Sequence, residues 1–173
     1  MKNIVKVIAV AAIVLGASST SSFAQASATA AASANIITPI TIVKTVDMNF
    51  GNVDVSATTA GTAVLAPAGT RTTGGAGGVT LPATTGTVAA ASFTVSGQAS
   101  YTYAITLPST CTITSSGHTM TVNAFTSYPS SIGTLSGTGS QTLTVGATLN
   151  VAAGQASGAY TNATGVPVTV NYN

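Results

Sequence analysis

Few side chains in this sequence have the chemistry that catalysis requires. The chain has one histidine, His118, and its only carboxylate side chains are Asp47 and Asp54. His118 lies in a Ser-Ser-Gly-His-Thr segment typical of a solvated turn, with no neighbour suited to orient it as a base. A glycosidase needs two carboxylates in one pocket with different pKa values, and the spacing of these two does not indicate such a pair. We therefore expect no catalytic residue and no enzymatic activity.

Metal and cofactor sites are equally hard to assemble from this composition. Cys111, His118 and the two acids show none of the spacings of known metal sites. The glycine-rich stretch 72–78 is not followed by the Lys-Ser or Lys-Thr pair of a phosphate loop, which favours a flexible turn between strands. We expect no metal and no cofactor.

Cys111 is the single cysteine of the chain, so it cannot form an internal disulfide. Two interpretations stay open. It is either a small buried residue that faces the core together with Ile113, or a partner in an intermolecular disulfide.

The first 24 residues predict export. Lys2 and Lys6 give a positive start, residues 7–15 form a short apolar run, and Ser22 and Ala24 occupy the −3 and −1 positions of a small-residue cleavage site. The apolar run is too short to span a bilayer. We expect a cleaved signal helix over residues 1–24. The mature chain would then lie in the periplasm, at the cell surface or outside the cell, without a membrane span.

Cleavage would also change the charge of the protein. Lys44 and Arg71 would remain against Asp47 and Asp54, which gives a formal net charge of zero. Two basic residues cannot form a patch that follows a phosphate backbone, so nucleic acid is excluded as a partner. A near-neutral surface is poorly protected against self-association, which would suit a subunit that assembles.

The rest of the chain predicts a low-complexity leader over residues 25–35 and a single domain over residues 36–173. Short strands are predicted at 36–43, 46–50, 62–65, 79–81, 92–95, 101–107, 111–114, 119–125, 141–149 and 166–172. Turn residues separate them at regular intervals, and no helical period is present. This pattern is typical of an all-β fold, an immunoglobulin-like antiparallel β-sandwich with Greek-key connections.

The last of these strands has the clearest alternation. Four apolar residues share one face, namely Val166, Val168, Val170 and Tyr172, while polar residues fill the other face after Pro167. Burying the four side chains would contribute about 1.5–3 kcal/mol each. We therefore expect this strand at the centre of the fold. Tyr160, just before it, is predicted to be a corner tyrosine whose hydroxyl holds the connecting loop.

Several segments, taken in order, resemble a known family. They include ITPITIVKTVDMNFGNV, AASFTVSGQASYTYAITLPST and the closing VTVNY. They look like the secreted bacterial family described only as a domain of unknown function, DUF4402, and the resemblance covers residues 36–173. That family is in turn similar to spore coat protein U domains and, more distantly, to chaperone–usher pilins. The resemblance implies a bacterial surface protein without known catalytic residues.

The pilin comparison implies a mode of assembly. One subunit donates an N-terminal strand to its neighbour, and a periplasmic chaperone binds the C-terminal strand by strand addition. Here the C-terminal assembly residues would be Val166, Val168, Val170 and Tyr172, and the donor or first strand would contain Ile36, Ile37, Ile40 and Ile42. Whether that first strand is donated or completes its own sheet stays open. The expected function is a pilin-like or coat subunit; the alternative is a monomeric secreted binding module or adhesin for carbohydrate or another surface.

Overall fold

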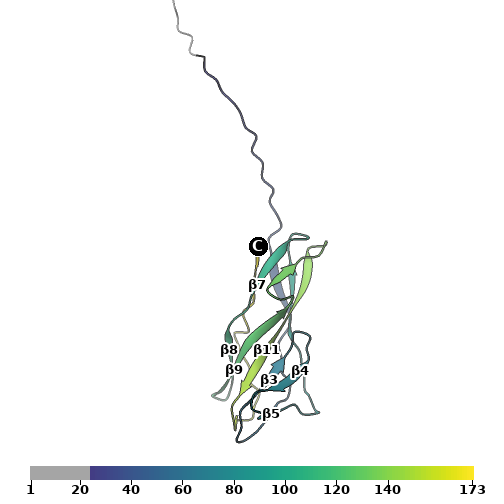
Figure 1. Cartoon of the computed structure of the whole chain (residues 1–173), viewed down its shortest axis with the longest axis vertical. Coiled ribbons are helices and arrows are strands. Elements are labelled where there is room, and N and C mark those ends of the chain that lie inside the picture. The colour runs from purple at the N-terminus through teal and green to yellow at the C-terminus, as the bar shows by residue number, and fades with distance from the viewer. Residues whose placement is uncertain (1–23) are drawn as a thin grey trace, which may run out of the picture. The chain divides into compact units, whose positions relative to one another are not determined.

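The computed structural model describes residues 24–173, of which Ile36–Asn173 form one compact unit (Figure 1). The described residues form twelve strands and no helix, and every strand pairing is antiparallel. The predicted all-β class is therefore confirmed. In this part of the chain no helix is present that could cross a membrane. The predicted signal helix lies outside the described residues except for Ala24, which is exposed.

The strands follow the chain in an order close to the predicted one. They are β1 (Thr41–Val46), β2 (Asp54–Val55), β3 (Gly61–Leu65), β4 (Arg71–Gly74), β5 (Val79–Thr80), β6 (Ala91–Ser96), β7 (Thr102–Thr106), β8 (Thr110–Ser115), β9 (His118–Tyr128), β10 (Ile132–Thr134), β11 (Ser140–Val151) and β12 (Thr169–Tyr172).

Strand β11 is the centre of a curled seven-stranded sheet. Its first half, from Ser140 to Val145, pairs with β6, and its second half, from Ala147 to Val151, pairs with β3. Residues Thr144–Asn150 of β11 also pair with β9. Because one edge of β11 is already paired with β6 and β3, β9 lies along its other edge. The sheet then continues from β6 to β1, from β3 to β4 and from β9 to β8. One long strand thus joins two half-sheets.

The alternation of β11 explains its central place. The side chains of Leu143, Val145, Leu149 and Val151 are buried, whereas Thr142 on the other face is exposed. A twelve-residue strand with this period buries one full face in the core and can be paired along both edges.

A second, three-stranded sheet has the order β10-β7-β12. Its inward residues share a core with β6 and the first half of β11. Buried members of this core include Phe93, Val95, Tyr103, Leu143 and Val170. The prediction that the C-terminal strand is central is therefore wrong, because β12 is only four residues long and pairs with β7 on one edge alone.

A second core lies under the other half of the seven-stranded sheet. Strands β3, β9 and β11 contribute Leu65, Val122 and Leu149 to it. Phe50, from the loop between β1 and β2, and Val79, from β5, also belong to this core. Strands β2 and β5 form a short ribbon of their own.

Four predicted segments differ from the observed strands. The strand predicted at 46–50 is not formed, since Val46 ends β1 and Asn49 makes only an isolated bridge to Ala89. The first strand begins at Thr41, not at residue 36, because Pro39 fixes φ and lacks the N–H that a ladder needs. Part of the glycine stretch 72–78 is paired, since β4 reaches Gly74. The last strand begins at Thr169, two residues after Pro167.

Tyr103 anchors the interior of the three-stranded sheet. Its hydroxyl donates to Gln141 Oε1 at 2.7 Å, and the amide of Thr134 donates to the same oxygen at 3.0 Å. The ring lies over Gly133, where a Cβ would stand only 2.2 Å from the ring carbon that carries the hydroxyl. Only glycine fits beneath this side chain.

Burial raises the pKa of Tyr103 above its ordinary value of 10.0. In the unfolded chain this hydroxyl ionises first as pH rises, so the unfolded state binds fewer protons and folding stability falls above about pH 10. We expect the free energy of unfolding of a Tyr103→Phe variant, measured with urea at pH 9 to 11, to fall less steeply with pH than that of the unmodified chain. The exposed control Tyr128→Phe should keep the slope of the unmodified chain, and equal slopes for both variants would contradict this role.

The opposite faces of β11 give a direct test of the core. Replacing the fully buried Leu143 by alanine should lower the free energy of unfolding by about 2–5 kcal/mol, because it leaves a cavity. Replacing the adjacent, exposed Thr142 by alanine should change it by less than about 0.5 kcal/mol. Urea denaturation measures both values, and a similar loss at the two positions would show that the face assignment is wrong.

Candidate functional site

The apolar face of the C-terminal strand points into the domain. Val170 is buried, and Val166, Val168 and Tyr172 are half-buried, while Thr169 is exposed. Val168, Val170 and Tyr172 pack in the core beneath β6 and β11. Val166 packs against the other core. The alternation predicted for these residues is confirmed. Their side chains stabilise their own domain and leave the main-chain edge of the strand as the feature open to a partner.

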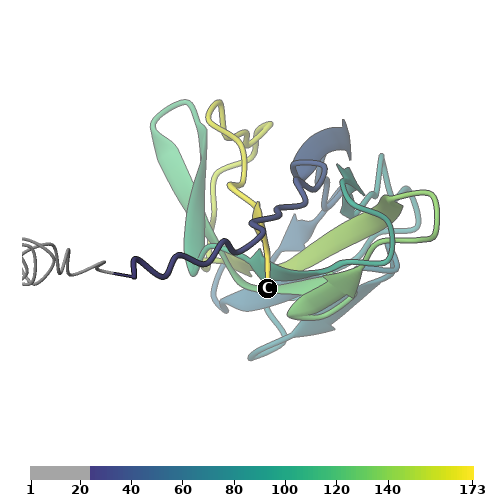
Figure 2. The same cartoon turned by 90° about the horizontal axis from the view of Figure 1, so that it is seen from above.

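Tyr172 ties the C-terminal strand to the start of the compact unit. Its hydroxyl accepts a hydrogen bond from the amide of Gln98 at 2.6 Å and donates to the carbonyl of Thr38 at 2.7 Å. The Thr38 amide in turn donates to Gln98 Oε1 at 3.2 Å. The ring packs edge to face against Tyr101 with centroids 5.7 Å apart. Figure 2 shows the start of the compact unit passing beside the C-terminal end of the chain.

The four N-terminal isoleucines divide into two groups. Ile40 and Ile42 pack against the core under β6, and β1 pairs with β6 from Thr41 onward. Ile37 is half-buried, whereas Ile36 is 95% exposed. Of the two arrangements left open by the sequence, the structure has β1 in its own sheet, and residues 24–40 before it belong to no strand.

Strands β1 and β12 each leave one edge without a paired strand in the described part of the chain. The Asn173 amide donates to the Thr102 carbonyl of β7, so by alternation the main-chain groups of Val170 and Tyr172 point away from β7. β1 is paired through β6 alone. The two strands are neighbours but share no hydrogen-bonded ladder. We call the region between them the β1–β12 seam.

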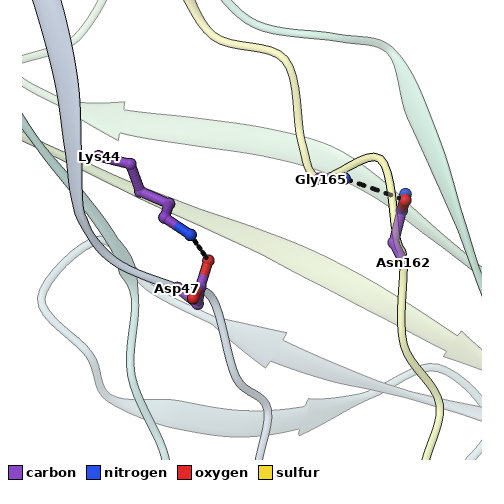
Figure 3. Close-up of polar contacts among 4 residues, drawn as sticks. All are labelled: Lys44, Asp47, Asn162 and Gly165. Atoms are coloured by element: carbon purple, nitrogen blue, oxygen red, sulfur yellow. Dashed lines mark hydrogen bonds and ion pairs between the residues drawn. The ribbon is translucent and has the colours of Figure 1, made fainter.

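One of the two basic residues of the described chain, Lys44, lies on β1 itself. Lys44 is neutralised by Asp47 at 2.5 Å on the surface (Figure 3). Arg71 donates to the carbonyl oxygens of Phe50 and Asn52. Sheet edges in monomeric proteins are commonly protected by lysine, proline or a covering loop. The exposed side chains of β12 are Thr169 and Asn171, which are uncharged and do not repel an added strand.

The residues that could have done chemistry lie apart. Asp47 is held by Lys44, Asp54 is exposed in β2, and His118 is exposed at the start of β9. No group of three or more His, Cys, Asp or Glu residues that could hold a metal occurs in residues 24–173.

Cys111 takes the first of its two predicted roles. It is a free, buried cysteine in the same core as Ile113. The side-chain amide of Asn162 donates to its sulfur at 2.7 Å. The carbonyl oxygen of that side chain accepts from the Gly165 amide at 3.1 Å (Figure 3), so the turn over the cysteine is held on both sides.

Tyr160 is a corner tyrosine, as predicted. Its hydroxyl donates to the carbonyl of Ala156, four residues earlier, at 2.8 Å and accepts from Gln155 Nε2 at 2.8 Å. It holds the loop that leads to β12. The role of Gln98 and Thr38 at the seam had no signal in the sequence, because both are ordinary polar residues of loops.

The hydroxyl of Tyr172 can be tested separately from its ring. A Tyr172→Phe variant keeps the packing against Tyr101 but loses the hydrogen bonds to Thr38 and Gln98. Its free energy of unfolding should therefore be about 1–2 kcal/mol lower than that of the unmodified chain. Tyr101→Phe is the matched control, because its hydroxyl takes part in neither contact, and it should be near neutral. Urea denaturation compares the two; equal stability of both variants would show that the hydroxyl does not tie the segments together.

Comparison with known proteins identifies the family but not an activity. No curated protein and no solved structure is significantly similar to the chain. The family model for a domain of unknown function, DUF4402, matches residues 40–172, which span β1 to β12. The chain therefore belongs to the DUF4402 family.

Proposed function

We propose that this protein is a non-enzymatic structural subunit of the bacterial cell surface, of pilin-like or coat type, which is exported and assembles by β-strand addition. The observation that carries the proposal is the β1–β12 seam, where two neighbouring strands leave their main-chain edges unpaired. The proposal includes an immunoglobulin-like arrangement of the two sheets, which the packing of the three-stranded sheet over β6 and β11 supports.

A strand added at the seam would gain main-chain hydrogen bonds from β12. Each contributes about 0.5–1.5 kcal/mol net, and apolar contacts with the adjoining core would add to this. Because β12 is already ordered, binding an added strand costs little further conformational entropy in β12. Side chains placed on alternate faces of the added strand would give the contact its specificity.

The weak charge of the surface supports the same function. A mature chain that begins after Ala24 has no net charge, and one of its two lysine or arginine side chains is paired with a carboxylate. Little electrostatic repulsion then opposes the contact between copies. A periplasmic chaperone that adds a strand to β12 would protect this edge before assembly, and we propose it as a partner together with further copies of the chain.

A second candidate is a monomeric secreted module or adhesin that binds carbohydrate. The edge-to-face pair of Tyr101 and Tyr172 favours it, because Tyr101 is 42% exposed and offers an aromatic surface. The two candidates differ in oligomeric state. Assembly requires contact between copies, whereas glycan binding by this pair does not.

The purified chain starting at Gln25 tests the proposal. We expect oligomers in size-exclusion chromatography with light scattering, and a ladder on unheated SDS gels that disappears on heating. Lysines placed along the open strands by Val43→Lys with Asn171→Lys should weaken the ladder, because edge charges oppose strand addition.

The control places the same charge elsewhere. Thr121→Lys with Thr126→Lys adds two lysines at exposed positions of β9, which pairs with β8 and β11, and should leave the ladder intact. A stable monomer in the unmodified chain at high concentration would contradict assembly and favour the binding module. Equal effects of the two double variants would contradict a role for these edges.

A further inference from the structure

Two rows of uncharged side chains cross the outer face of the seven-stranded sheet. Strands β8, β9, β11, β3 and β4 lie side by side here (Figure 1), and their residues pair without a register shift between the two rows. The first row is Thr110, Asn123, Thr148, Val64 and Thr72, and the second is Thr112, Thr121, Asn150, Thr62 and Gly74. In β8, β9, β11 and β3 the residue between the two rows is buried, so the rows face away from the core. We call them the threonine rows.

The six threonine hydroxyls of the threonine rows are open to a ligand. Within residues 24–173 no other protein group makes a hydrogen bond to them, and none is a buried polar atom without a partner. A hydroxyl both donates and accepts, so each of the six can pair with a hydroxyl of a ligand. Neither row contains a charged residue. The rows therefore suit a neutral ligand with many hydroxyls and offer no counter-charge to an anionic one.

The two asparagines of the threonine rows are held in a fixed orientation. Asn150 Nδ2 donates to the Thr121 carbonyl at 3.1 Å and to Asn123 Oδ1 at 2.9 Å. These bonds leave Asn150 Oδ1 as an acceptor and Asn123 Nδ2 as a donor on neighbouring strands. Because the two amides are already oriented, a ligand that pairs with both pays little for ordering them.

A hollow adjoins the second row. It has a volume of about 370 Å³, and its lining includes Thr62 and Asn150 of this row beside the small residues Gly75, Ala76 and Ala152. Gly74 keeps the Thr62 hydroxyl clear, since a Cβ at position 74 would stand 2.9 Å from Thr62 Oγ1. The volume lies within the range of small-molecule sites, about 300–1,000 Å³. Apolar walls next to polar groups suit a sugar ring, which has apolar faces and a rim of hydroxyls.

The spacing of the strands suits a linear chain of sugars. Neighbouring strands lie about 4.8 Å apart. This is close to the length of one residue in an extended glycan chain, so a chain that crosses the strands presents one sugar to each. The sheet twists from strand to strand, and a single chain can follow that twist, whereas a rigid flat surface cannot. Val64 and the threonine methyl groups supply apolar contacts for the ring faces.

We propose that the threonine rows and the adjoining hollow bind a neutral polysaccharide, with one chain running across β8, β9, β11, β3 and β4 and one of its sugars in the hollow. The inference goes beyond the proposed function, because it assigns a ligand to a sheet face that strand addition does not use. It also differs from glycan binding at the Tyr101 and Tyr172 pair, which lies beside the start of the compact unit.

Affinity gel electrophoresis of the chain starting at Gln25 tests this site. Dextran, laminarin or galactomannan is cast in the gel, with alginate as the anionic comparison and a gel without polysaccharide as the reference. We expect retardation by at least one neutral polysaccharide and not by alginate. Thr62→Val, Thr112→Val and Thr121→Val together remove three hydroxyls but keep a side-chain type that strands favour. This triple variant should bind about tenfold or more weakly, because three hydrogen bonds to the ligand are lost.

The matched control removes three hydroxyls from the same outer face outside the threonine rows. Thr94→Val, Thr126→Val and Thr142→Val together should bind as the unmodified chain does. An equal loss in both triple variants would overturn the assignment to the rows, and so would binding that depends on Tyr101 and not on the rows. No retardation by any of the three neutral polysaccharides, or equal retardation by alginate, would overturn the inference as a whole. None of these readings depends on whether copies of the chain assemble.

Discussion

The pairing of β11 along both of its edges is the constraint on which this fold depends. Its first half joins β6 and its second half joins β3 on one edge, while β9 runs along the other. Five inward apolar residues of this one strand, from Leu143 to Val151, reach both cores. Because the two half-sheets share β11, neither can shift its register by one residue without turning a whole apolar face outward. The remaining strands are positioned relative to this one.

The β1–β12 seam follows from that arrangement. Strand β1 lies at the end of the half-sheet formed by β6, and β12 lies at the end of the three-stranded sheet that packs across it. The two ends meet without a ladder and are tied at one point, where the Tyr172 hydroxyl contacts Thr38 and Gln98. The tie holds the segment before β1 beside the end of β12 within the compact unit.

The reactive side chains of the described residues are few and are not gathered in one site. The carboxylates and the histidine of the described residues lie apart on the surface, and the cysteine is enclosed by the core and by the turn at Asn162. Three tyrosine hydroxyls make structural hydrogen bonds: Tyr103 inside the three-stranded sheet, Tyr160 at the corner before β12 and Tyr172 at the seam. Tyr103 and Tyr172 join segments far apart in the sequence, whereas Tyr160 closes its own loop.

The sequence by itself determined the all-β class, the approximate position of most strands, the inward face of β12 and the corner role of Tyr160. These features are local: the alternation of side chains and the placement of proline and glycine act within a few residues. Only the tertiary structure decided that β11 is central and β12 lies at an edge, that part of the glycine stretch pairs as β4, and that β1 completes its own sheet. The reason is physical. A strand with one buried face has the same side-chain period whether one or both of its main-chain edges are paired, and the partner is chosen by contacts between residues far apart in the chain.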